Sequence, residues 1–161
     1  MARCLIIGCG CRGRALTRAL VERGHAVRGT TRDARSISAI SDAGAEPVVA
    51  DPDVVGTVVG ALDHVTVVCI LLGSATGSRE QLAALHGPRL EMLLTKLVDT
   101  TARGIVYEAA GTVGPGALRQ GAERVLSFGE DSLASTVMLE ADPADHGAWL
   151  EAALAAVSRI L

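Results

Sequence analysis

Three glycines near the start of the chain have the spacing of a nucleotide-binding turn, Gly8-x-Gly10-x-x-Gly13. The apolar run 4–7 precedes them, and residues 13–23 follow with apolar side chains at helical spacing. In such a strand–turn–helix unit, Gly8 permits a tight turn and Gly10 leaves room for a pyrophosphate, while Gly13 lets the helix pack closely on the strand. The sequence therefore predicts a dinucleotide site. The alternative is a glycine-rich turn with an empty pocket.

The helix after this turn is expected to present unpaired backbone amides, and its dipole favours an anion at the same end. Cys11 and Arg12 lie in this first turn. We therefore expect both residues to take part in cofactor binding.

The end of the second predicted strand, 25–29, indicates which dinucleotide is preferred. A chain that selects NAD usually places Asp or Glu there, to accept hydrogen bonds from the ribose 2′-hydroxyl. The next residues here are instead Thr30, Thr31 and Arg32. They can donate to a 2′-phosphate, which Arg12 can approach from the other side, whereas Asp33 is better explained as a helix cap. We expect NADP(H) rather than NAD(H), the alternative being that both arginines are solvated surface residues.

Composition restricts the class of protein and its partners. Of the 161 residues, 49% are apolar and only 2% aromatic, so the core must be aliphatic and no platform for stacking bases is expected. The net charge of −3 argues against nucleic-acid and anionic-membrane partners. We expect no signal peptide, because only four apolar residues separate Arg3 from Gly8, and the longest apolar run, 65–72, is too short to cross a bilayer. The cysteines and histidines lack zinc-site spacing. A soluble, cytoplasmic protein without a metal is expected.

Strand-like and helix-like segments alternate along the whole chain, which is typical of a parallel sheet covered by helices on both faces. The expected strands are 4–7, 25–29, 45–50, 65–72, 104–109 and 134–140. The expected helices are 13–23, 33–42, one beginning at 51–53, 80–102 with a kink or break at Gly87-Pro88, 117–130 and 143–160. We predict an α/β fold: a single domain over residues 1–161 with a doubly wound Rossmann sheet of about six strands in the order 3-2-1-4-5-6.

Two segments carry a family resemblance. Residues 5–33, LIIGCGCRGRALTRALVERGHAVRGTTRD, and 44–73, GAEPVVADPDVVGTVVGALDHVTVVCILLG, resemble the amino-terminal half of atypical and extended short-chain dehydrogenase/reductases. The similarity is greatest to the epimerase-like branch, whose glycine turn reads Gly-Cys-Gly-x-x-Gly. It extends from residue 3 to about 110 and more loosely to 140.

The resemblance implies further cofactor contacts. Asp51 stands where that family has the acid that contacts the adenine amino group, and Pro52 takes the place of the residue after it. Leu72 and Gly73 match the segment that passes beneath the adenosine ribose and the nicotinamide.

The catalytic residues of that family are absent. The family uses a Ser at the end of the fifth strand and a Tyr-x-x-x-Lys motif, whose Tyr is the general acid/base. The corresponding places hold Ala109, Ala110, Pro115 and Arg119, followed by Glu123 at the place of a trailing acid. Alanine and proline have no proton to donate, and arginine stays protonated near neutral pH. Extended members also carry a carboxy-terminal substrate domain, which we expect this chain to lack.

Three functions follow as alternatives. The missing acid/base residues favour a cofactor-binding or sensing module without dehydrogenase chemistry. A small NADP-dependent oxidoreductase or epimerase acting on a small-molecule substrate would need other groups, the candidates being Cys69, His86, Glu108 and Thr112. A nucleotide-sensing regulatory domain of a transport system ranks lower, because that group usually has an acidic strand-two tip. Cys69 is expected in the core, and Glu108 is expected to be solvated or paired with an arginine.

A homodimer is the other partner considered. The segment 89–100 has a wide apolar face formed by Leu90, Leu93, Leu94, Leu97 and Val98. Extended family members dimerise through helices in this region, so the face predicts a homodimer. The alternative is ordinary packing of the helix on the sheet.

Overall fold

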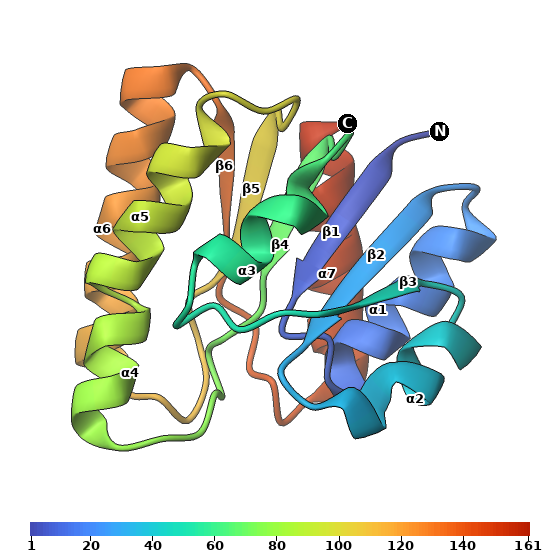
Figure 1. The fold of residues 1–161 in the computed structure, drawn as a ribbon, viewed down its shortest axis with the longest axis horizontal. Helices are drawn as coiled ribbons and strands as arrows, with labels where there is room; N and C mark the ends of the chain where they lie inside the picture. Colours follow the sequence, from blue (N-terminus) through green and yellow to red (C-terminus); the bar gives the residue numbers. More distant parts are fainter.

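The computed structural model describes residues 1–161 as one six-stranded parallel sheet with helices on both faces (Figure 1). The strand order is β3-β2-β1-β4-β5-β6, which confirms the predicted doubly wound topology. The strands are β1 (Arg3–Ile7), β2 (Ala26–Thr31), β3 (Glu46–Val49), β4 (Val67–Ile70), β5 (Gly104–Glu108) and β6 (Ser135–Leu139). The helices are α1 (Cys11–Glu22), α2 (Ile37–Asp42), α3 (Gly56–Val59), α4 (Arg79–Leu85), α5 (Pro88–Leu97), α6 (Pro115–Ser132) and α7 (His146–Ile160), with short 3₁₀ turns at Ala34–Ser36 and Gly60–Leu62.

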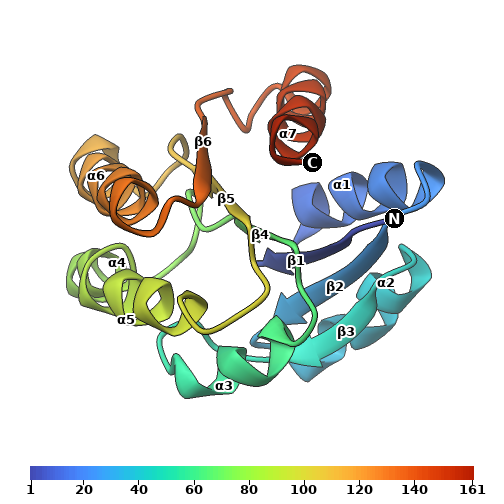
Figure 2. The ribbon, with the colours of Figure 1, turned by 90° about the horizontal axis from the view of Figure 1, so that it is seen from above.

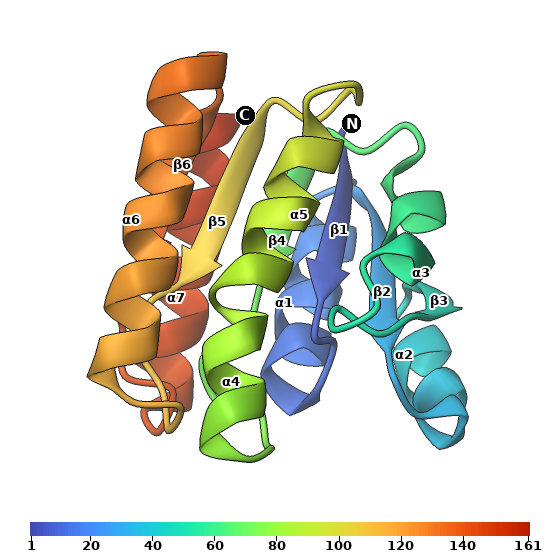
Figure 3. The same cartoon turned by 60° about the vertical axis from the view of Figure 1, so that its left-hand side comes forward.

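The sheet divides the core into two apolar layers. Helices α1, α2 and α7 cover one face, and α3, α4, α5 and α6 lie on the other (Figure 2). All four residues of β4 are buried, as expected for a central strand that contacts helices on both sides. Because every strand is parallel, all six carboxyl ends meet at one edge, where the loops that carry the candidate site begin (Figure 3).

One predicted helix break is confirmed, and one predicted helix start is wrong. The predicted helix 80–102 is divided at Gly87 and Pro88 into α4 and α5, because proline cannot continue a helix without losing a backbone hydrogen bond. The expectation that a helix begins at 51–53 is wrong, since α3 starts only at Gly56. The Asp51 carboxylate instead accepts a hydrogen bond from the Asp53 amide at 2.9 Å, and this forms a turn that includes Pro52.

The apolar face predicted to form a homodimer is used inside the chain. Its four leucines are buried in the core layer shared by α3, α5 and α6, and only Val98 is exposed; they are Leu90, Leu93, Leu94 and Leu97. The four leucines thus follow the alternative of packing on the sheet, and the homodimer stays a prediction. None of the helices combines the length and apolarity needed to cross a membrane.

The side chain of Tyr107 in β5 is held by contacts with His86 and with Gly121 of α6. Tyr107 is fully buried in β5, and its hydroxyl lies 2.6 Å from His86 Nδ1. His86 Nε2 lies 3.0 Å from the Leu72 carbonyl oxygen. A carbonyl can only accept, so Nε2 carries the proton and Nδ1 accepts from the Tyr107 hydroxyl. Gly121 faces this hydroxyl so closely that a Cβ would collide with it.

We expect Gly121→Ala to lower the free energy of unfolding by about 2–3 kcal/mol, because the added methyl must displace Tyr107 from its hydrogen bond. Urea titration followed by circular dichroism measures the change. The matched control is Gly116→Ala in the first turn of the same helix, where a Cβ meets no atom within 4 Å. The control should be neutral or stabilising by about 0.5–1 kcal/mol. Equal effects at both positions would contradict the packing explanation.

Candidate functional site

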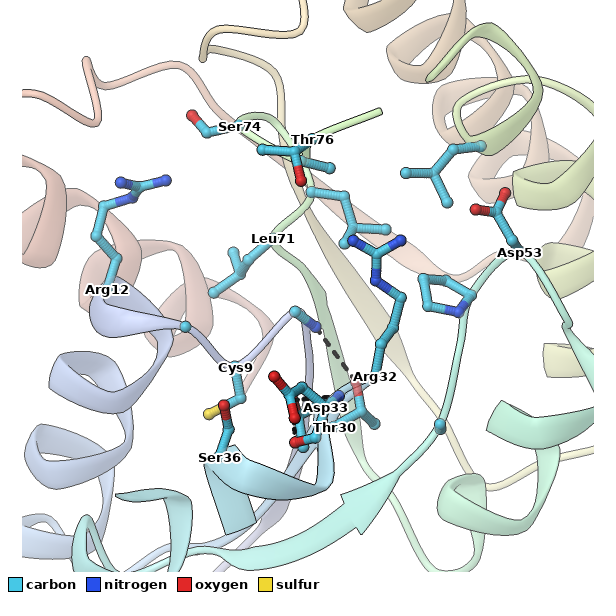
Figure 4. Close-up of a pocket in the computed structure, with 18 of the residues that line it drawn as sticks. Cys9, Arg12, Thr30, Arg32, Asp33, Ser36, Asp53, Leu71, Ser74 and Thr76 are labelled. Atoms are coloured by element: carbon cyan, nitrogen blue, oxygen red, sulfur yellow. Dashed lines mark hydrogen bonds between the residues drawn. The ribbon is translucent and has the colours of Figure 1, made fainter. Parts of the chain in front are cut away.

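A cleft with a volume of about 350 Å³ opens at the carboxyl ends of the central strands (Figure 4). It is bounded by the turn after β1, the end of β2, the turn after β3 and the loop after β4. Its lining residues are Gly8, Cys9, Gly10, Arg12, Arg14, Thr30, Thr31, Arg32, Asp33, Ser36, Ala50, Pro52, Asp53, Leu71, Leu72, Ser74, Ala75, Thr76 and Leu85. Doubly wound sheets bind their ligands at this position, where the strand order reverses between β1 and β4.

The glycine turn has the geometry of a phosphate cradle. Gly8 has a φ of +83°, and a Cβ there would lie 2.6 Å from the Leu71 carbonyl oxygen. At Gly13 a Cβ would lie 3.2 Å from the Gly8 carbonyl oxygen, so this glycine permits the helix to pack closely. A Cβ at Gly10 would meet no atom within 4 Å, which means that this position faces open space. The glycines therefore keep the turn compact and leave its outer surface free for a ligand.

The start of α1 is suited to an anion. Gly10 occupies the cap position, no side chain caps the helix, and no acidic residue lies in the first turn. The amides of this turn therefore keep their hydrogen-bonding capacity toward the cleft. Cys11 is exposed and lines a smaller hollow next to the cleft, together with Arg12, Gly13 and Glu108. These features fit a pyrophosphate group.

The end of β2 places one free cation at the cleft. Arg32 is exposed and makes no ion pair. The two threonines before it have intramolecular partners: Thr30 Oγ1 accepts from the Gly8 amide at 3.3 Å, and Thr31 Oγ1 donates to the Asp33 carbonyl at 3.1 Å. Their hydroxyl groups therefore support the turn and the loop, and Arg32 is the free donor at this end.

Asp33 is the acid closest in sequence to the strand tip, and it is paired. Its carboxylate receives hydrogen bonds from the Arg35 guanidinium at 2.7 and 3.0 Å and from the Arg35 amide at 2.9 Å. These contacts lower the pKa of Asp33. Asp33 also caps the 3₁₀ turn Ala34–Ser36, as the sequence predicted for a cap. Its charge is thus balanced by a neighbouring cation.

Arg12 and Arg32 both line the cleft, and that they flank one phosphate stays a prediction. The two side chains lie on different sides of the cleft in Figure 4. The guanidinium of Arg12 lies beside Glu108 and Trp149, with Nε 3.9 Å from Glu108 Oε2 and Cζ 5.8 Å from the indole ring centre. The reason is tertiary: α7 brings Trp149 against the start of α1.

Of the residues that the family resemblance implies as cofactor contacts, some line the cleft and others make hydrogen bonds within the protein. Pro52 and Leu72 line the cleft. Asp51 is outside the lining set, because its carboxylate binds the Asp53 amide, and Asp53 is the acid that faces the cleft. The amide of Gly73 donates to Glu108 Oε1 at 2.9 Å.

Of the four candidate reactive groups, only Thr112 is exposed. Cys69 is fully buried in β4, as expected, and His86 is buried in its contacts with Tyr107 and Leu72. Glu108 is 1% exposed and forms an ion pair with Arg12, so of its two expected environments the pairing with an arginine is confirmed and the solvated one is wrong. Its Oε2 accepts from Trp149 Nε1 at 2.8 Å, and burial raises its pKa while its hydrogen bonds and Arg12 oppose the rise.

Sequence reasoning missed the Tyr107–His86–Leu72 chain and the Glu108–Trp149 bond. Their members are 14 to 41 residues apart, on different elements, and no spacing motif links them. A polar residue at the end of an apolar strand was the only available signal.

A second, wider hollow of about 670 Å³ lies beside the ends of β5 and β6. It shares Arg12 and Ser74 with the cleft, and its other lining residues are Ala110, Gly111, Thr112, Glu140, Asp142, Pro143, Ala144 and His146. Arg119 is exposed on α6 and lines neither of these two hollows.

Comparison with known proteins agrees with this geometry. The family described as NAD(P)H-binding matches residues 8–126. No curated protein sequence is significantly similar to this chain.

Several solved structures share the fold. A short-chain dehydrogenase/reductase superfamily protein from Agrobacterium tumefaciens with bound NAD superimposes with a TM-score of 0.71 at 21% identity, over 86% of this chain and 48% of that chain. UDP-glucuronic acid 4-epimerase from Bacillus cereus in complex with NAD has a TM-score of 0.71 at 13% identity, over 86% and 55%. Vestitone reductase from alfalfa (Medicago sativa) has a TM-score of 0.66 at 16% identity, over 86% and 56%. The chain thus spans about half the length of these proteins.

The buried His86 makes stability depend on pH. Burial lowers its pKa from the ordinary value of 6.5. The unfolded chain therefore binds more protons than the folded chain below about pH 6.5, and stability falls as the pH drops through this range.

We expect urea unfolding to show a smaller loss between pH 7.5 and pH 5.5 in His86→Gln than in wild type. Both proteins have the same carboxyl groups, so these do not affect the difference between the two profiles. Among them, the raised pKa of Glu108 increases stability as the pH falls, which is opposite to the effect of His86. An identical pH profile in the two proteins would contradict the assignment to His86.

Proposed function

Because the chain belongs to the NAD(P)H-binding family, we propose that it binds NADP(H) in preference to NAD(H) and acts as a cofactor-binding or sensing module. The observation that carries the proposal is the combination of the uncapped α1 start with the unpaired Arg32 at the β2 tip. The first favours the pyrophosphate, and the second favours the additional 2′-phosphate.

The placement of Asp33 supports the preference for NADP(H). An acid that selects NAD must accept hydrogen bonds from the ribose 2′-hydroxyl. Here the Asp33 carboxylate already binds Arg35 through both of its oxygens and caps the following 3₁₀ turn. Because Arg35 balances the charge of Asp33, Arg32 leaves this end of the cleft with a positive charge. A positive charge suits a phosphate better than a hydroxyl group.

The cofactor would extend across the switch point. Its 2′-phosphate would face Arg32, the pyrophosphate would lie on the amides around Gly10 and Cys11, and the adenosine would contact Asp53 and the turn at Pro52. When bound, NADP(H) supplies a hydride donor or acceptor. Of the chain's own residues, Thr30 holds the turn through the Gly8 amide and His86 holds the Leu72 carbonyl beneath the ligand.

The second candidate is a small oxidoreductase, and the wide hollow beside β5 and β6 favours it. The exposed groups there that can exchange a proton are Thr112, Glu140, Asp142 and His146. The module remains the preferred function, because three of the four candidate reactive side chains are buried.

We expect Arg32→Ala to weaken NADP binding by about 10- to 100-fold, because a charge-assisted contact with the 2′-phosphate is lost. Binding of NAD should change less than about twofold, since NAD lacks that phosphate. Isothermal titration calorimetry with both cofactors measures the effect. Arg18→Ala, an exposed arginine on the outer side of α1, removes the same charge and should leave both affinities unchanged. Equal losses for NAD and NADP in Arg32→Ala would contradict the proposed preference.

The module should bind NADPH without consuming it. We expect no decrease in absorbance at 340 nm when saturated protein is incubated with panels of aldehydes, ketones and sugar nucleotides. Oxidation of NADPH by any of these compounds, above the rate without protein, would contradict the cofactor-binding module and favour the small oxidoreductase. If Thr112→Val or His146→Gln then abolished that rate, the hollow beside β5 and β6 would be its site.

A further inference from the structure

Arg12 has a hydrogen-bond donor without an acceptor in the protein without ligand. Its Nε is buried and makes no hydrogen bond, while the side chain as a whole is 27% exposed. The carboxylate nearest to it, Glu108, is 3.9 Å away, which is beyond hydrogen-bonding distance. The attraction between the two is therefore mainly electrostatic, and a buried donor remains without an acceptor.

Glu108, in contrast, does not depend on Arg12 for its hydrogen bonds. Oε1 accepts from the Gly73 amide at 2.9 Å, and Oε2 accepts from Trp149 Nε1 at 2.8 Å. These two donors come from the loop after β4 and from α7, so the carboxylate is fixed in position. If Arg12 moved away, Glu108 would still keep both hydrogen bonds.

Arg12 also lies where a bound dinucleotide must pass. It is the second residue of α1, directly after the glycine turn, and it lines the cleft, the small hollow under the turn and the wide hollow beside β5. Figure 4 shows its guanidinium at the edge of the cleft, on the side of Ser74 and away from Arg32. A phosphate at the glycine turn offers it several acceptor oxygens, which Glu108 does not.

On the basis of the proposed function, we propose that Glu108 restrains Arg12 in the free protein and competes with the anionic bridge of the dinucleotide for its guanidinium. Glu108 thereby lowers the affinity for the cofactor. Binding moves Arg12 from Glu108 and Trp149 to the ligand. The other charged and titratable side chains of the wide hollow are Glu140, Asp142 and His146, and those of the cleft are Arg14, Arg32, Asp33 and Asp53. None of them makes an ion pair with Arg12.

This competition predicts an unusual sign for a substitution beside the site. We expect Glu108→Gln to bind oxidised NADP about three- to tenfold more tightly than wild type, because Arg12 is released. Arg12→Ala should bind about tenfold more weakly. In the Arg12→Ala background, adding Glu108→Gln should change the affinity by less than about twofold, since nothing is left to release. Calorimetry on the four proteins measures this cycle.

Two controls separate the contact from general effects. Glu151→Gln removes the same charge from an exposed position on α7 and should leave the affinity unchanged. Thermal unfolding of each variant checks its stability, because glutamine keeps only one acceptor oxygen for the two donors that Glu108 serves. Unchanged or weaker binding by Glu108→Gln would overturn the proposal, and so would an equal gain in the Arg12→Ala background, which would indicate a general effect of charge.

Trp149 provides a second measurement that needs no change at Glu108. It is the single tryptophan of the chain, and Arg12 lies over its ring. Saturation of the wild-type protein with oxidised NADP should shift the fluorescence emission of Trp149 toward that of the Arg12→Ala variant without ligand. If binding leaves the emission unchanged, Arg12 has not moved and the inference is wrong although the proposed function stands. If wild type binds neither NADP nor NAD, the proposed function fails and the inference fails with it.

Discussion

The cleft depends on the close approach of the ends of β1 and β4 at Gly8. With a φ of +83° and the Leu71 carbonyl oxygen 2.6 Å from the place of a Cβ, this position has no room for a side chain. The Gly8 and Cys9 amides then donate to the hydroxyl and carbonyl oxygens of Thr30, at 3.3 and 2.9 Å. A single turn thus joins the ends of three strands and determines where the start of α1 faces.

The two sides of the cleft differ in how their charged groups are arranged. At the β2 tip, Asp33 and Arg35 are paired in solvent and Arg32 is left free. Around Glu108, the polar groups are buried between elements, and the carboxylate joins the loop after β4 to α7. A buried group that loses a hydrogen bond is destabilised, so Glu108 keeps its two hydrogen bonds. The buried Nε of Arg12 makes no hydrogen bond, so Arg12 loses none when it moves to a new partner.

Packing also accounts for the polar side chains His86 and Glu108 beside the ends of β4 and β5. His86 is held between Tyr107 and Leu72, and Glu108 is held by Gly73 and Trp149. These two polar groups therefore support the backbone around the cleft. This arrangement is consistent with a fold that keeps the geometry of nucleotide binding while its interior groups are committed to structure.

The sequence by itself determined the alternation of strands and helices, the glycine turn and the break at Gly87-Pro88, because periodicity, glycine spacing and proline act over a few neighbouring residues. The strand order followed from that alternation through the right-handedness of parallel crossovers. It left open what distant elements decide. Only the packing of α7 turns Arg12 toward Trp149 and away from Arg32, and only the sheet decides that the apolar face of α5 is buried. The direction of a long side chain is set by contacts between elements, and a local pattern carries no information about them.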